Sequence, residues 1–548
     1  MRRLLLLAVA CLVLPAPALA GVTLTDFKVE PAGTQAGSHP AVKITQAFAY
    51  TSTSDDAQDT FVRLAPGLLG NPQNAALCTG EQMRSSAGCP PDAKVGSVVV
   101  TAGVIDPILG LRLLGLTVPG TVYNLRPTGT EPARVGLALQ ALGGLSRSYL
   151  EAPVRLRPGP DGIGLETLFE DQPREAGLDI QIERVELTFD GAASKGSFMR
   201  MPTSCATGTS LARANSYEAP NVSSEKTFQL TPTGCDALGF TPRAEGSLGT
   251  PGQTRIGDFP PLETTLRLDP EQAALNRVEV TLPSSLAANG AAVARACPRP
   301  EAAATTCPDS SRVGTAIIDS PLQASPVQGP VYLAYNNPSQ LPGLIVVLPP
   351  PVDLRIDGVA EIGKGLRNIF PTNPDLPLRS FTLAFGGGPN GVLQLSRDLC
   401  DVRTPTSIGV KLTSHAGHVR EFEQELATPG CDPRARISLV KAKRSWTLTA
   451  LLQAARRGPD ITSAKVALPK ALKKGRRTPR VHVDGARQRI RRPRRAVRPK
   501  LGDGARRVKI VWKGLKPRRK LKKTVIVPVT MVDERGKSFP LKVRVPRG

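Results

Sequence analysis

Short runs of alternating apolar and polar residues recur along the whole chain, and they end in Pro, Gly, Asn or Asp. Residues 278–283 read V-E-V-T-L-P, and residues 185–191 read V-E-L-T-F-D-G. A period of two is typical of strands that bury one face. Two sheets packed face to face satisfy this pattern for every strand. The sequence therefore predicts an all-β chain built from β-sandwiches.

A large module is repeated within the chain. The stretch C-P-P-D-A-K-V-G-S from Cys89 recurs as C-P-D-S-S-R-V-G-T from Cys307, and T-P-T-G-C at 231–235 recurs as A-T-P-G-C at 427–431. Several ordered matches of this kind indicate an internal duplication. The offset between the copies shrinks along the chain, so the first copy carries about two dozen additional residues in its middle.

The C-terminal region lacks cysteine but retains two landmarks of the repeat. Residues 466–472, V-A-L-P-K-A-L, match V-T-L-P-S-S-L at 280–286, and V-K-I-V-W-K-G at 508–514 matches the run at 185–191. We infer one type of sandwich whose middle is expanded in the first two copies. Two immunoglobulin-sized domains per large copy remain an alternative. A closing hairpin is expected around the turn at 533–536.

These observations divide the chain into four parts. We expect a signal peptide at 1–20, β-sandwich module 1 at 21–237, β-sandwich module 2 at 238–432, and a basic sandwich-like C-terminal domain with flexible Arg/Lys-rich loops at 433–548. Two arginines, an apolar run to Leu14 and A-L-A at 18–20 have the form of a secretory signal. A transmembrane anchor needs a longer apolar run, and Cys11 lies in a poor lipobox.

The architecture resembles that of large secreted bacterial proteins built from β-sandwich repeats, many of them without assigned function. This resemblance implies an extracellular or cell-surface location and no particular activity.

Eight cysteines remain after the signal, an even number that argues for disulfides in an exported protein. None has C-x-x-C spacing, so a zinc site has little support. The intervals repeat, 11 and 30 residues in the first copy and 10 and 31 in the second. This repetition favours four local pairs: Cys78 with Cys89, Cys205 with Cys235, Cys297 with Cys307, and Cys400 with Cys431.

The composition narrows the classes of protein further. With 51 Gly and 52 Pro among 548 residues, long helical bundles are excluded. The most apolar later segment, residues 104–118, is too short to cross a bilayer and contains charges. We expect an inserted hairpin packed on its own module there, and the alternative is an exposed loop that binds a protein partner or lipid.

Motifs that carry chemistry are mostly missing from the sequence, which has no G-x-S-x-G, H-E-x-x-H or P-loop. His415 and His418 have no carboxylate or cysteine support in the sequence, so we interpret them as a solvated loop. Asp55, Asp56 and Asp59 match no calcium loop and are interpreted as a solvated hairpin tip. We therefore expect a non-enzymatic protein without catalytic residues, cofactor or metal.

Charge is distributed very unevenly. Residues 432–548 contain 37 Lys and Arg against six Asp and Glu, whereas residues 21–431 contain 32 basic and 40 acidic residues. This density of basic residues exceeds that of an ordinary solvated protein face, so it predicts an anionic partner. The candidate anion-binding residues are Lys473, Lys474, Arg476, Arg477, Arg491, Arg492, Arg494, Arg495, Arg518 and Arg519.

Three anionic partners fit this charge: an acidic cell-envelope polymer, anionic lipid, or extracellular nucleic acid. Proteins that bind single-stranded nucleic acid combine basic groups with aromatic side chains that stack on the bases. The aromatic residues of this region are only Trp446, Trp512 and Phe539. Export places the envelope nearer than DNA. We therefore expect a secreted modular interaction protein of the cell surface, held by its C-terminal domain on an anionic envelope. The alternatives are an extracellular hydrolase with a dispersed active site and a secreted binder of duplex DNA.

Overall fold

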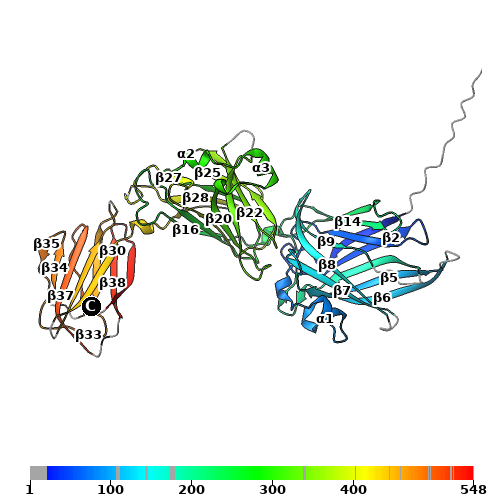
Figure 1. The fold of residues 1–548 in the computed structure, drawn as a ribbon, viewed down its shortest axis with the longest axis horizontal. Helices are drawn as coiled ribbons and strands as arrows, with labels where there is room; N and C mark the ends of the chain where they lie inside the picture. Colours follow the sequence, from blue (N-terminus) through cyan, green and yellow to red (C-terminus); the bar gives the residue numbers. More distant parts are fainter. Residues whose placement is uncertain are drawn as a thin grey trace, which may run out of the picture.

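The computed structural model describes residues 21–106, 111–141, 146–172, 179–336, 341–363, 365–401, 403–442, 445–456, 458–491, 493, 495–518, 521 and 524–546. The expected signal peptide at 1–20 lies outside this range. The described chain is all-β and forms three sandwiches that follow one another in sequence order (Figure 1).

The first sandwich consists of one continuous 11-stranded sheet that folds over into two layers. Its order is β1 (Val22–Pro31), β2 (Val42–Tyr50), β10 (Asp179–Phe189), β5 (Lys94–Ile105), β6 (Arg112–Leu125), β7 (Ala133–Ala141), β8 (Ser146–Gly159), β9 (Gly162–Phe169), β3 (Ala57–Arg63), β14 (Gly208–Ser216) and β15 (Ser224–Leu230). The two edges meet, because β1 lies against β14 and β15. There the Leu24 N–H donates to the Ser224 hydroxyl at 3.0 Å.

The second sandwich has the same strand order, but its layers are separate sheets. The larger sheet contains β16 (Arg243–Leu248), β17 (Leu262–Arg267), β26 (Ser380–Phe385), β20 (Arg312–Asp319), β21 (Val327–Ala334), β22 (Gly343–Leu348) and β23 (Leu354–Asp357). The other contains β24 (Val359–Ile362), β25 (Leu366–Phe370), β18 (Leu275–Thr281), β28 (Ser407–Ser414) and β29 (Val419–Glu425). Only Gly358 separates β23 from β24. The two strands together take the place of β8, which runs through both layers unbroken.

The third sandwich keeps this order, and its described residues contain no equivalents of β7 and β8. One sheet contains β30 (Arg434–Ala442), β31 (Ser445–Gln453), β37 (Arg507–Pro517), β34 (Arg480–Val483) and β35 (Ala486–Gln488), with β33 (Leu472–Lys473) also paired to β37. The second contains β36 (Ala496–Val497), β32 (Ile461–Ala467), β38 (Thr524–Asp533) and β39 (Ser538–Pro546). The predicted closing hairpin is the β38–β39 pair. An expanded middle in the two larger copies therefore agrees with the sequence comparison.

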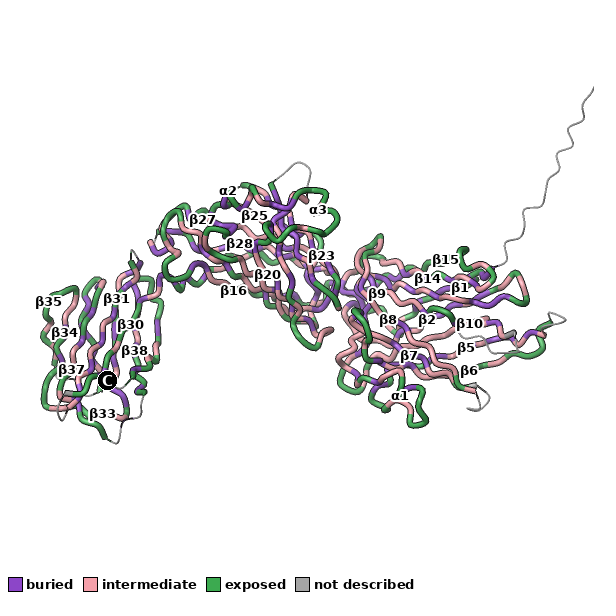
Figure 2. Tube along the Cα trace, in the orientation of Figure 1, coloured by how far each residue is buried: buried purple, intermediate pink, exposed green. Residues whose placement is uncertain are grey.

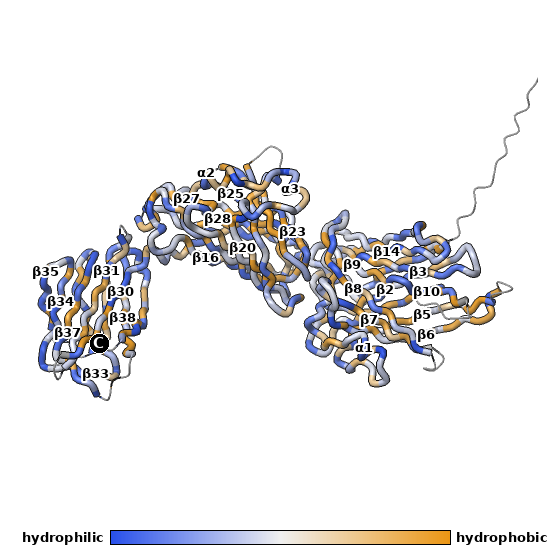
Figure 3. The backbone as a smooth tube through the Cα atoms, viewed as in Figure 1, coloured by the Kyte–Doolittle hydropathy of each residue, from blue (hydrophilic) through white to orange (hydrophobic). Residues whose placement is uncertain are grey.

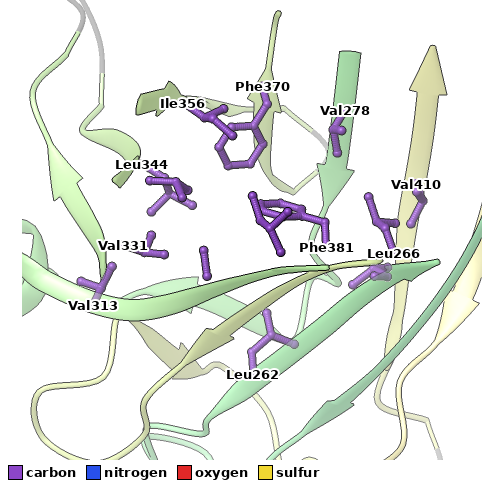
Figure 4. Packing of buried hydrophobic residues seen from close by; sticks show 14 of the residues in the cluster. Leu262, Leu266, Val278, Val313, Val331, Leu344, Ile356, Phe370, Phe381 and Val410 are labelled. Atoms are coloured by element: carbon purple, nitrogen blue, oxygen red, sulfur yellow. The ribbon is translucent and has the colours of Figure 1, made fainter. Parts of the chain in front are cut away.

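Each large copy is one sandwich around one main core, and not two immunoglobulin-sized domains. In the second copy the side chains of both sheets interdigitate: Phe370, Phe381, Leu266 and Val278 meet between the layers (Figure 4). Buried and exposed positions alternate along the strands of all three sandwiches (Figure 2). This alternation is what the period of two predicts.

Several short elements lie outside the main sheets of the described chain. The helices are α1 (Gly80–Arg84), α2 (Gly290–Val293) and α3 (Arg299–Ala304); the short strand pairs are β4 (Leu69–Gly70) with β13 (Met199–Arg200), β11 (Ala192–Ala193) with β12 (Gly196–Ser197), and β19 (Leu286–Ala288) with β27 (Leu393–Leu395).

The structure contains the four disulfide bonds in the pairing that the repeated intervals favour. The Cys78–Cys89 and Cys297–Cys307 bonds each enclose one helix, α1 and α3.

The first two sandwiches share a packed junction. Leu69 and Leu156 of the first belong to the core cluster of the second. Arg157 of the first forms an ion pair with Asp353 of the second at 2.8 Å. These contacts hold the two large modules against each other, so they form one structural unit.

Candidate anion-binding site

The outer face of the sheet that contains β30, β31, β37, β34 and β35 carries basic side chains on neighbouring strands. The pairing register places Arg436, Lys509, His482 and Arg487 in one row that crosses the sheet, with Leu451 between the first two. The opposite faces of these strands are buried, because Val508, Ile510 and Trp512 alternate with Lys509 on β37. The period-two pattern therefore turns the basic residues of these strands toward solvent.

Further bases occupy outward positions beside this row: Arg434, Arg480 and Arg507 are exposed. None of these arginines, nor Lys509, forms an ion pair with another described residue. The neighbouring acids have other partners. Asp484 accepts hydrogen bonds from the N–H groups of Arg506 and Arg507, and Asp460 pairs with the Arg506 guanidinium at 2.9 Å. The face therefore presents uncompensated positive charge.

A groove of about 890 Å³ lies along the other sheet of this sandwich, between β32, β36 and β38. Among the described residues, four bases line it, Lys465, Lys470, Arg495 and Arg498, and no acid does. Its remaining walls include apolar residues, among them Leu468, Val525, Ile526 and Pro528. A cleft with cations on apolar walls is suited to an anion attached to a less polar body, such as a sugar or an acyl glycerol.

The structure divides the sequence-predicted bases among several places. Among them Arg495 lines the groove, while Lys473, Lys474, Arg476, Arg477, Arg491 and Arg518 are exposed elsewhere on the same sandwich. Arg492, Arg494 and Arg519 lie outside the described residues. Lys465, Lys470 and Arg498 also line the groove, although they are not among the predicted site residues. Lys465 could have been found, because it occupies a polar position in the alternating run that becomes β32.

The aromatic residues of the basic sandwich are in its core. Trp446, Trp512 and Phe539 are 7%, 1% and 8% exposed. They cannot stack on bases from the outside. The described surface of this sandwich therefore lacks the aromatic platform that readers of single-stranded nucleic acid use.

The two histidines considered as metal ligands make hydrogen bonds within their own sandwich. His415 bonds through Nε2 to the Asn373 carbonyl at 2.9 Å, while the His418 N–H donates to the Ser414 hydroxyl. No group of three or more His, Cys, Asp or Glu positioned to hold a metal occurs among the described residues. No described helix is long and apolar enough to cross a membrane.

The interpretation of Asp55, Asp56 and Asp59 as a solvated tip is wrong. Asp55 and Asp56 are buried, and Asp55 accepts hydrogen bonds from the N–H groups of Asp56 and Glu218, both at 3.0 Å. Asp59 accepts from the Asn215 side chain. Buried carboxylates of this kind satisfy backbone donors, because an unpaired N–H in the interior is costly.

The apolar segment 104–118 forms the end of the β5–β6 hairpin, with residues 107–110 outside the described range. The predicted hairpin is present. The prediction that it packs fully on its own module is wrong. Leu111, Leu113 and Leu114 are 59%, 63% and 56% exposed. Binding of a protein partner or lipid by these leucines stays a prediction.

Comparison with known proteins finds no matching family model and no matching curated protein. Among solved structures, the chain is similar to a putative membrane-anchored protein from Corynebacterium diphtheriae, with 8% identity over 96% of this chain and 95% of that one and a TM-score of 0.16. It is also similar to the major pilin subunit of Bacillus cereus, with 10% identity over 73% of this chain and 93% of that one and a TM-score of 0.17. A third is the B domain of a biofilm-associated protein, with 6% identity over 57% of this chain and 87% of that one and a TM-score of 0.17. By name, these neighbours are a membrane-anchored protein, a pilin subunit and a biofilm-associated protein.

Proposed function

We propose that this chain is a secreted, non-enzymatic interaction protein of the cell surface, held by charge on an anionic envelope polymer or lipid through its C-terminal sandwich. Four disulfides support an extracellular location, because such bonds persist in oxidising compartments. In this arrangement the two large modules form the part presented to the surroundings.

The proposal rests on two basic surfaces of the C-terminal sandwich, the groove on one sheet and the outer face of the other sheet. Lys465, Lys470, Arg495 and Arg498 line one side of the sandwich without an acid among them. Arg436, Lys509 and Arg487 lie in one row on the other sheet. Two positive surfaces on one small domain fit an extended partner with many negative charges better than a single small anion.

The test is adsorption of the full chain to purified envelope and to vesicles rich in anionic phospholipid, at increasing salt. Binding through charge releases counterions, so affinity should fall steeply with ionic strength as the Debye length drops below ~10 Å. Binding that ignores salt would contradict the proposal. Duplex DNA at equal salt serves as the competing partner, and tighter binding to DNA would also contradict it.

A matched pair of variants locates the contact. Changing Lys465, Lys470, Arg495 and Arg498 together to Gln should weaken adsorption at least tenfold and reduce its salt dependence. The control changes four exposed bases of the first two modules to Gln, which alters net charge by the same amount: Lys94, Arg126, Lys226 and Arg255. Equal weakening by both sets would show that net charge matters and the groove does not.

A further inference from the structure

The first sandwich encloses a cavity of about 430 Å³ between its two layers. Strands β2, β3 and β5 to β10 all contribute to its wall, and most lining side chains are aliphatic or aromatic. Val118, Leu139, Leu150 and Val185 are among them, and each is only partly buried although it faces the interior. The volume lies within the ~300–1,000 Å³ typical of small-molecule pockets.

Comparison of equivalent strands explains why this space exists. On β10, Val185 pairs with Gln46 of β2, and at the equivalent place in the second sandwich Phe381 of β26 pairs with Leu266 of β17. Phe381 and Leu266 meet in the packed core of the second sandwich (Figure 4). The first sandwich has a smaller and a more polar residue where the second has two large apolar ones, so its layers are not filled.

Gln46 is unusual at this position. The third sandwich also has a leucine there, since Leu452 of β31 pairs with Val508 of β37. Gln46 is 7% exposed, and its Nε2 has no hydrogen-bond partner among the described residues. Thr167 also lines the cavity and has a buried hydroxyl without a described partner. The lining is thus mostly apolar with several polar positions, and Gln46 is the place where the second sandwich has a filling leucine instead.

The cavity is long and narrow. Its lining runs from Ile180 to Phe189 on β10 and from Ser146 to Leu156 on β8. At ~3.3 Å per strand residue these spans correspond to roughly 30 Å. At one end the second sandwich closes the space, because Leu322 and Gln323 contribute to the wall. A volume of 430 Å³ over such a length suits a single extended chain and not a compact ring system.

The apolar wall continues beyond the opposite end onto the β5–β6 hairpin. Leu114 lies on the same face of β6 as the lining residues Leu116 and Val118. This hairpin points away from the second sandwich, and its hydrophobic colour extends toward the tip (Figure 3). The exposed Leu114 thus continues the apolar lining of the cavity toward the surface.

We propose that the first sandwich binds one extended hydrocarbon chain, the acyl chain of a fatty acid or lipid, which enters at the hairpin end and lies between the layers. Burial of the chain against aliphatic walls provides the affinity, because it removes apolar surface from water. This inference does not depend on the charge of the C-terminal sandwich.

The test uses the full mature chain and the fluorescent fatty acid cis-parinaric acid. We expect saturable binding of one molecule per chain. Val185→Phe reproduces the residue of the second sandwich and should weaken binding at least tenfold. The control, Thr117→Phe, adds the same side chain at an exposed position on β6 and should bind like wild type. No saturable binding by wild type, or equal binding by both variants, would overturn the proposal.

A second filling variant, Val118→Phe, separates loss of the cavity from loss of the fold. Both filling variants should keep the four disulfides and melt no lower than wild type, because a filled cavity is stabilised. Retained binding in both folded variants would contradict the proposal. Vesicles with pyrene-labelled acyl chains distinguish the source: uptake from vesicles indicates a membrane lipid, and uptake of free acid alone indicates a fatty acid. Uptake from neither overturns the idea.

Discussion

The hydroxyl of Thr203 in the first sandwich donates a hydrogen bond to the carboxylate of Asp375 in the second, at 2.7 Å. Both residues are buried, with Thr203 0% and Asp375 5% exposed. Asp375 also accepts the N–H groups of Thr203 and Ser204, at 2.7 and 3.2 Å. One carboxylate therefore satisfies three donors of the neighbouring module. The burial of Arg200 at this junction lowers the pKa of its guanidinium, and Asp375 opposes that shift.

We predict that Asp375→Ala destabilises the junction by about 3 kcal/mol, because it leaves buried donors without an acceptor. Asp375→Asn retains one acceptor oxygen and should cost about half as much. Urea unfolding followed by hydrogen exchange in residues 21–432 measures both changes. Equal stability of Asp375→Ala and wild type would show that the two large modules do not depend on this contact.

Gly67 offers an independent test of the same junction. Its φ is +81°, and a Cβ there would lie 2.7 Å from an Asp375 oxygen. Gly67→Ala therefore combines an unfavourable backbone conformation with a clash against the buried carboxylate. It should lower the melting temperature of the first two modules, whereas Gly88→Ala, also at positive φ but with open space, should lower it less.

Reduction should affect the three sandwiches differently. The bonds close loops with separations of 10 to 31 residues, and each stabilises its module by about 3 to 4 kcal/mol in the chain-entropy model. After treatment with a reductant, hydrogen exchange should rise in residues 21–432 and stay unchanged in the cysteine-free third sandwich. Equal protection of all three after reduction would contradict the assigned role of the bonds.

Asp401, next to the disulfide-bonded Cys400 of the second sandwich, should titrate unusually low. Hydrogen bonds from the Arg403 side chain and N–H lower the pKa of its carboxyl from the usual 3.8 to about 2. A lowered pKa in the folded state means that this pairing stabilises the fold above pH 3.8 and is lost as pH falls toward 2. NMR titration of the carboxyl carbon measures the value. Arg403→Gln should raise it toward 3.8, and Arg255→Gln should leave it unchanged.

Much of the architecture follows from local pattern. Alternation at 185–191, 381–387 and 508–514 predicts strands, and these became β10, β26 and β37, which occupy the same place in the three sandwiches. The disulfide pairs follow from repeated spacing. Such features are encoded in neighbouring residues and are preserved when a module is duplicated, so a single sequence is sufficient to detect them.

The anion site and the cavity were decided by tertiary structure. Lys465 and Arg495 are 30 positions apart and line one groove only because β32 pairs with β36. Asp55 and Asp56 read as a solvated loop, and they are buried because distant backbone donors need acceptors.

The sequence by itself determined the strands, the repeat and the concentration of charge in the last sandwich, because each depends on residues that are close in the chain. Only the tertiary structure decided which faces meet. Val185 looks like any inward strand residue, and its position opposite Gln46, where the second copy has Phe381 opposite Leu266, leaves the layers of the first sandwich unfilled. Packing density depends on residues brought together across strands, and no local pattern reports it.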